Sequence, residues 1–358
     1  MMRILTRYLY RQYIGLFLFC VAGVVMLFVI VDLVEHMDKF IDKGLSAGIV
    51  LQYYYYYIPS ILVLILPVAT LLATVFSVGN MASRNEILAL KALGYSLYQM
   101  LVVLLPLGLI VAALSFWVAE VWVAETAENR LAIEREHLGS GDQVKASRLV
   151  NLEIREGDRL ITLGRFNPVN HVATRVKIEQ LRGGRLVART DADSMWYRGD
   201  QWVIWKGVER QFFGDDERVR KIADTLSVAL SLSPKELMRA QGNPEDMGYF
   251  DLKRYVEIMR RSGGEVYGFL TQLHLRVSFP ISNVIIIIFS LPLAYNRRKK
   301  SVAIGFGISL AVCFFYFGLV KLGQALGENG HLPPLLAAWM GNGVMAVGSA
   351  VNLVKTRK

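Results

Sequence analysis

The sequence predicts a polytopic α-helical membrane protein, with six transmembrane helices arranged three before and three after an inserted all-β domain. Three observations support this fold class. Hydrophobic residues make up 54% of the chain and the mean hydropathy is +0.37, which is more apolar than ordinary soluble domains. Long apolar segments recur at both ends of the chain, and the pattern between them changes to short alternating stretches. The expected parts are residues 1–119, 120–268 and 269–358.

Six segments are long enough to span a bilayer, because a helix needs about 20 mainly apolar residues to cross the hydrocarbon core. They are residues 13–31, 58–78, 100–119, 275–294, 302–324 and 335–354. Prolines inside the second, third and fourth segments are expected to kink helices within a bundle, where neighbours satisfy the freed backbone groups. Cys20 and Cys313 lie inside apolar segments and are expected to pack there without forming a disulfide.

Positively charged residues predict the orientation of these helices. The net charge of +10 could suggest nucleic-acid binding, but the basic clusters lie at the ends of apolar segments, as membrane anchors do. Twelve lie on one side: Arg3, Arg7, Arg11, Arg84, Lys91, Arg297, Arg298, Lys299, Lys300, Lys355, Arg357 and Lys358. The other side, leaving out the long domain, has two, Lys39 and Lys43. Both termini are therefore predicted to be cytoplasmic and residues 120–268 periplasmic, in a bacterial inner membrane.

The inserted domain is predicted to be an antiparallel sandwich or jelly roll. Its expected strands are residues 148–154, 159–166, 175–181, 185–190, 201–206 and 208–213, separated by turn signals. Arg198-Gly199-Asp200 is interpreted as a hairpin turn. Ser233 to Glu236 has the spacing of a capping box, and a second helix is expected at residues 252–262, ending before Gly263-Gly264.

No signature of catalysis or cofactor binding is present in the sequence. There is no G-x-x-x-x-G-K-[ST] motif, no H-E-x-x-H and no C-x-x-C, and the five histidines are never spaced at i,i+4. Asp191 and Asp193 could form an acid/base pair, but their spacing is equally that of a solvated strand face. We therefore expect no enzymatic activity, metal or cofactor in this chain, and energy supplied from elsewhere.

The segment after the second apolar stretch, residues 79–96, is the most informative on the cytoplasmic side. Ser83 and Glu86 have the spacing of a capping box, Lys91 suits the C-terminal end of a helix dipole, and Gly94 suits a helix stop. These signals predict a short helix at residues 84–93, which needs a surface to pack on. Either it lies on the membrane or it docks into a cytoplasmic ATPase. On the second interpretation the coupling residues are Ser83, Arg84, Glu86, Leu88 and Gly94.

Three segments resemble the LptF/LptG permease family: residues 81–96, residues 252–264, and Leu332–Trp339, which opens the last apolar segment. The second and the third are closer to the LptG branch. The resemblance runs over nearly the whole chain in order. It implies a heterodimer with a paralogous permease, an LptB-type ATPase dimer that binds ATP, an LptC-type single-span protein and an LptA-type bridge. It implies that the substrate is lipopolysaccharide. If the short helix docks into an ATPase, Glu86 either caps that helix or forms a salt bridge to the ATPase, and the sequence does not decide between the two.

Cations at the outer ends of the apolar segments are candidates for binding the lipid A phosphates. They are Lys39, Lys43, Arg130, Arg135, Arg276 and Lys321. The alternative is that these side chains extend to ordinary headgroups. Lipopolysaccharide contact is favoured for Lys39 and Lys43, because the family that the chain resembles has lysines there. Nearby Asp32, Glu35 and Asp38 are expected to pair with them or to bind divalent ions. Apolar residues of the first, second and fifth segments could line an acyl-chain cavity.

Two other functions remain open. One is a permease of another ABC-type exporter, although such proteins typically place the large domain between the first two spans. The other is a membrane scaffold or sensor that transports nothing, needs no capped cytoplasmic helix and would not bind an ATPase. A secondary transporter is disfavoured, because its sites usually involve charged or broken helices near the midplane.

Overall fold

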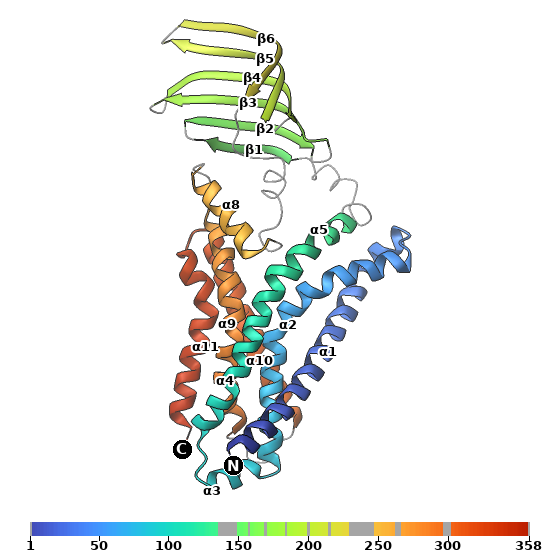
Figure 1. The fold of residues 1–358 in the computed structure, drawn as a ribbon, viewed down its shortest axis with the longest axis vertical. Coiled ribbons are helices and arrows are strands. Elements are labelled where there is room, and N and C mark those ends of the chain that lie inside the picture. The colour runs from blue at the N-terminus through green and yellow to red at the C-terminus, as the bar shows by residue number, and fades with distance from the viewer. Residues whose placement is uncertain are drawn as a thin grey trace. The chain divides into compact units, whose positions relative to one another are not determined.

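The computed structural model describes residues 2–134, 149–156, 158–167, 170–182, 185–198, 201–213, 216–228, 247–261, 266–295 and 302–356 (Figure 1). The chain forms two compact units. One contains residues 1–131 and 267–358, and the other contains residues 132–266.

The first unit is a bundle of helices (Figure 1). Its elements are α1 (Met2–Asp42), α2 (Ala47–Ser83), α3 (Glu86–Ala92), α4 (Leu97–Trp117), the π-helical turn η1 (Val118–Val123), α5 (Ala124–Ile133), α9 (Tyr267–Tyr295), α10 (Val302–Glu328) and α11 (Pro334–Lys355). Within the described residues, six helical runs are long and apolar enough to cross a membrane. These six helices agree with the six predicted spans, and each extends beyond its predicted segment at one end or both. The third run continues without a break from Leu97 to Ile133.

Helix α2 lies at the centre of the bundle and α1 lies at its edge. In the most apolar 18-residue window of α2, 72% of the residues are buried, against 11% in α1. The larger apolar core joins α1, α2, α4 and the end of α9, and includes Tyr13, Met81, Leu104 and Leu291. Both cysteines are free and buried, as expected. Helix α1 thus packs against the bundle with one face, whereas α2 is in contact with other helices on most sides.

Close contacts between small residues join the last helices. A Cβ atom at Gly327 of α10 would lie 2.6 Å from the Cβ of Ala337 in α11, and one at Gly341 would lie 2.8 Å from a methyl group of Val320. Such small residues let helix backbones approach one another in membranes. Buried Asn342 of α11 adds polar contacts: its amide donates to the carbonyl of Ser278 in α9 and accepts from the Tyr316 hydroxyl of α10, at 3.1 Å.

The described strands of the second unit form one antiparallel sheet in the order β1-β2-β3-β4-β5-β6. Their bounds are β1 (Leu149–Glu156), β2 (Arg159–Asn167), β3 (Val172–Arg182), β4 (Arg185–Arg198), β5 (Gln201–Phe213) and β6 (Asp216–Val228). Ile161, Phe166, Met195 and Trp202 belong to its apolar core. The antiparallel sheet is confirmed. An up-and-down order within one sheet does not establish a jelly roll, which therefore stays a prediction.

Several strand and helix predictions are corrected. Residues 201–206 and 208–213 are not two strands but one, because a bulge between Trp205 and Gly207 keeps β5 paired with β6. Strand β6 was not predicted at all.

Asp191 and Asp193 lie inside β4, and Asp191 accepts hydrogen bonds from the Arg189 guanidinium at 2.8–3.0 Å, which raises the pKa of Arg189. Helix α8 spans Tyr249–Arg261; the predicted Ser233 helix and the Gly263-Gly264 stop lie outside the described residues.

Candidate functional site

Helix α3 lies at one end of the bundle, beside the start of α1 and close to the end where α11 finishes (Figure 1). It connects α2 to α4, and it is only seven residues long. A helix this short is marginal in water by itself and depends on packing. The contacts of its side chains therefore determine what this end of the molecule can bind.

The predicted capping box at Ser83 and Glu86 is wrong. Ser83 is the last residue of α2, and its hydroxyl donates to the carbonyl of Asn80 at 2.8 Å. Arg84 caps the end of α2, and Asn85 precedes α3 in a left-handed conformation with φ of 59° and no side-chain cap. The sequence signal failed because α2 continues through Ser83, which leaves only a sharp corner before α3. Glu86 is thus free of a capping role.

The C-terminal end of α3 is as predicted. Gly94 has φ of +78°, a conformation that favours glycine. The amide of Gly94 donates to the carbonyl of Lys91, and the amide of Tyr95 to that of Leu90, both at 2.9 Å. These two bonds define a Schellman motif. Ser96 then begins α4 with a complete capping box to Gln99, so the observed capping box lies thirteen residues after the predicted one.

The inward side of α3 has three anchors. Ile87 is buried in the apolar core of the bundle. The Lys91 ammonium lies 4.2 Å from the ring centroid of Tyr295, at the end of α9. The Glu86 carboxylate accepts hydrogen bonds from the Tyr8 hydroxyl of α1, at 3.0 and 3.2 Å to its two oxygens. Helix α3 is therefore attached to the core, to α9 and to α1 by different residues.

The outward side of α3 is apolar and uncovered within the described residues. Leu88 and Leu93 are 63% and 65% exposed, and Ala89 and Ala92 between them are also exposed. At 3.6 residues per turn these four positions form one continuous face, opposite Ile87. An apolar face on a helix that is already anchored on its other side is suited to binding another protein.

Lys39 and Lys43 lie at the opposite end of α1, exposed near the corner that leads into α2. Gly44, with φ of +61°, makes this corner possible. The nearby acids differ from expectation. Asp32 is buried and accepts a 2.9 Å hydrogen bond from Tyr54 of α2, while His36 lies 3.6 Å from the same carboxylate. The prediction that Asp32 pairs with the lysines is therefore wrong. The side chain of Asp32 instead joins α1 to α2.

The other predicted lipid-binding cations lie on separate helices. Arg130 of α5 stacks over the ring of Tyr57 in α2, at 5.1 Å. Arg276 is half-buried on α9. Lys321 of α10 donates to Gln324 at 3.0 Å, and Gln324 and Gln272 both donate to Glu328, at 2.9 and 2.7 Å. Arg135 lies outside the described residues. Their roles in lipid binding stay predictions, with Lys39 and Lys43 the most accessible pair.

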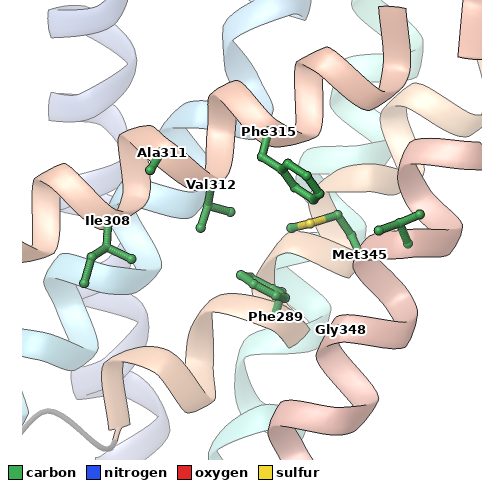
Figure 2. Close-up of a pocket in the computed structure, with 8 residues that line it drawn as sticks. Phe289, Ile308, Ala311, Val312, Phe315, Met345 and Gly348 are labelled. Atoms are coloured by element: carbon green, nitrogen blue, oxygen red, sulfur yellow. The ribbon is translucent and has the colours of Figure 1, made fainter. Parts of the chain in front are cut away.

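An apolar cavity of about 360 Å³ opens between α9, α10 and α11. Figure 2 shows Phe289, Phe315 and Met345, one from each helix, directed toward a shared space. Phe289 and Gly348 each lie about two turns from the ends of α9 and α11 on the same side as α3. This cavity is thus lined by the fourth, fifth and sixth predicted spans. The sequence analysis had instead suggested an acyl-chain cavity lined by the first, second and fifth.

Among the described residues no cluster of His, Cys, Asp or Glu is arranged to hold a metal ion. The suggestion that Asp32, Glu35 and Asp38 bind divalent ions therefore gains no support from their geometry. The partners of Glu86 and Asp32 are Tyr8 and Tyr54. Sequence reasoning missed both tyrosines, because each lies in or beside an apolar segment where an aromatic residue is ordinary.

A family model described as lipopolysaccharide export system permease LptF/LptG matches residues 7–355. The lipopolysaccharide export system permease protein LptG of Haemophilus influenzae is 21% identical over 272 residues, which cover 74% of this chain and 73% of that protein.

Proposed function

The chain belongs to the LptF/LptG family of lipopolysaccharide export permeases, and from this premise we propose that it is the membrane subunit of an ABC-type exporter driven by a separate ATPase. As a family member it is a multi-pass inner-membrane transport protein and a non-enzymatic permease subunit. The proposal adds that the substrate is extracted from the outer leaflet and passed to a periplasmic bridge. The weak similarity to an LptG protein favours the LptG branch.

The observation that carries this proposal is the two-sided construction of α3. Three inward residues, Ile87, Lys91 and Glu86, attach α3 to the rest of the bundle. On the other side of the helix, Leu88 and Leu93 form an exposed apolar face at the end of the bundle. The charge distribution supports a cytoplasmic location for this end. A helix that lay on the membrane surface would direct its apolar residues toward the bundle and the lipid. Here the outward apolar face is suited to the groove of a cytoplasmic ATPase.

We assign the lipid phosphates to the other end of the bundle, with Lys39 and Lys43 as the first contacts. Both lysines are exposed beyond the predicted first span, where the headgroup of an outer-leaflet lipid would lie. The cavity between α9, α10 and α11 lies in the half of the bundle near α3, which is the cytoplasmic half in this orientation. We therefore do not assign the lipid A acyl chains to it.

The remaining partners are proposed from the family and from the sheet. A paralogous permease would complete the transport pathway, with an LptC-type single-span protein beside it. The order of the strands leaves β1 and β6 as the two edges of the described sheet, and edge strands can pair with a strand of another protein. An LptA-type bridge that receives the lipid could use such an edge.

Affinity purification of the tagged chain in mild detergent tests the proposal. We expect an ATPase, a second permease of similar size and lipopolysaccharide to purify with it. The variant Leu88→Asp/Leu93→Asp should lose the ATPase and keep the second permease, because only the outward face of α3 is changed. Leu51→Asp, at a similarly exposed leucine of α2, is the matched control. Purification without any ATPase would instead support a scaffold or sensor.

A further inference from the structure

A hydrogen bond joins helix α1 to α3, and the function proposed above uses it only as an anchor. The hydroxyl of Tyr8 donates to Glu86, with distances of 3.2 Å to Oε1 and 3.0 Å to Oε2. A hydrogen bond to an ionised carboxylate is stronger than one between neutral groups. Tyr8 and Glu86 are 78 residues apart in sequence, so this bond is a tertiary link between two helices.

We propose that Tyr8 is a positioning residue that transmits the movement of α3 to α1 through this hydrogen bond, so that the docked ATPase acts on α1. This inference rests on the function proposed above. It concerns a residue that the motif at residues 81–96 does not contain. The hydrogen bond would make α1 a helix that the motor moves, rather than a passive membrane anchor.

The attachments of α3 support such a link. Ile87, the second residue of α3, is buried and attaches the start of this helix to the bundle. Glu86, at the beginning of α3, is bonded to α1, whereas Lys91, near its end, packs on Tyr295 of α9. The exposed Leu88 and Leu93 belong to the same short segment as these anchors. A force on the outward face would therefore be transmitted to α1 through Glu86.

The packing of α1 also suits this role. Only 11% of its most apolar window is buried within this chain, so α1 packs against the bundle with one face only. Near Tyr8, its contacts with the rest of the bundle include the buried side chains of Leu9 and Tyr13 and a 3.3 Å hydrogen bond from Gln12 to the carbonyl of Ser77. The far end of α1 carries Lys39 and Lys43, so movement of this helix would reach the proposed lipid contacts.

Substitutions separate the hydrogen bond from the charge of Glu86. Tyr8→Phe removes the hydroxyl that donates to Glu86, together with its contact with Arg84. Glu86→Gln removes the negative charge and keeps an oxygen that accepts from Tyr8, whereas Glu86→Ala removes both. Tyr10→Phe, on the same helix, is the matched control, because it deletes the same atom two residues away. Each variant is purified as the full exporter complex in lipid and assayed for bound ATPase, ATP hydrolysis and lipopolysaccharide released per ATP.

We expect Tyr8→Phe to retain the ATPase and its hydrolysis, while lipid released per ATP falls about fivefold, the factor that corresponds to one hydrogen bond. Tyr8→Phe combined with Glu86→Ala should be no worse than Glu86→Ala alone, since residues that act through one contact are not additive. Tyr10→Phe should match the unsubstituted complex.

The outcomes distinguish the two proposals. If Tyr8→Phe releases as much lipid per ATP as the unsubstituted complex, the link is overturned and the permease function stands. If Tyr8→Phe merely loses the ATPase, the bond is a static brace for docking and the inference is also overturned. If the unsubstituted complex contains no ATPase, both proposals fail.

Discussion

At the scale of single residues, the proposed lipid contacts make the first prediction. Lys39 lies in the last turn of α1, and Lys43 follows four residues later, just after the helix ends. Replacing both with Glu should strongly reduce the lipopolysaccharide that purifies with the complex, because two attractive charges become repulsive toward the phosphates. Replacement with Gln should give an intermediate loss. The lipid is measured by mass spectrometry of the purified complex.

The control for this prediction is Lys355→Glu, which reverses an exposed charge at the other end of the bundle. It should leave lipid content unchanged. Equal lipid content in the Lys39→Glu/Lys43→Glu variant would show that the two lysines contact ordinary headgroups.

A second residue-scale prediction concerns Asn342, which is 3% exposed and joins α9, α10 and α11. Asn342→Ala removes one donor and one acceptor. Hydrogen bonds between membrane helices contribute about 0.6 kcal/mol on average and up to about 1.7 kcal/mol. We therefore expect the free energy of unfolding in detergent to fall by about 1–2 kcal/mol. Tyr316→Phe should cost less, because only one of the two bonds is lost. Unfolding by a denaturing detergent, followed by circular dichroism, measures both; an equal cost would contradict the assignment.

Local signals predicted the residues whose conformation is decided locally. Gly94 was identified as a helix stop because only its own backbone and the last turn of α3 are involved. Ser83 and Glu86 were misassigned because the same spacing can arise where one helix ends and another begins. The true partner of Glu86, Tyr8, lies on another helix, and no local pattern specifies a contact across 78 residues.

At the scale of elements, the packing of α10 against α11 makes a third prediction. Gly327→Leu should destabilise the isolated chain by about 1–3 kcal/mol, the usual cost of overpacking, because a Cβ there already meets Ala337 and Thr271 at 2.6 Å. Gly318→Leu is the matched control on the same helix, since a Cβ at Gly318 would meet nothing within 4 Å. Thermal unfolding of both variants in detergent measures the difference, and equal stability would contradict this packing.

Long apolar elements were predictable and the strands were less so. Length and hydropathy are sufficient for a membrane helix, because the bilayer itself sets the requirement. Strand β5 was divided because Gly207 looked like a break. In the structure a Cβ at Gly207 would lie 2.9 Å from the carbonyl oxygen of Asp191, so glycine allows the close approach of β4 at a bulge. Strand β6 was missed because charged residues such as Arg218 and Lys221 obscure its alternation.

At the scale of the whole molecule, hydropathy predicted how many helices cross the membrane, but not which of them form the centre. That α2 is central and α1 peripheral depends on which faces are complementary, through contacts such as Thr70 to Asn283 between α2 and α9 at 3.0 Å. The orientation, by contrast, depends on flanking charge alone, so it can be tested without reference to packing.

The final prediction is this orientation. In a background with Cys20 and Cys313 replaced by Ala, single cysteines are placed at four exposed positions: Ala47 and Asn329 at one end of the bundle, and Arg84 and Lys355 at the other. In cells with a permeabilised outer membrane, a membrane-impermeant maleimide should label Ala47→Cys and Asn329→Cys, because the side poor in Lys and Arg faces the periplasm. Arg84→Cys and Lys355→Cys should react only after the inner membrane is opened. Labelling of Arg84→Cys in cells with an intact inner membrane would place α3 outside, where no ATPase could reach it, and would remove the basis of the coupling proposal.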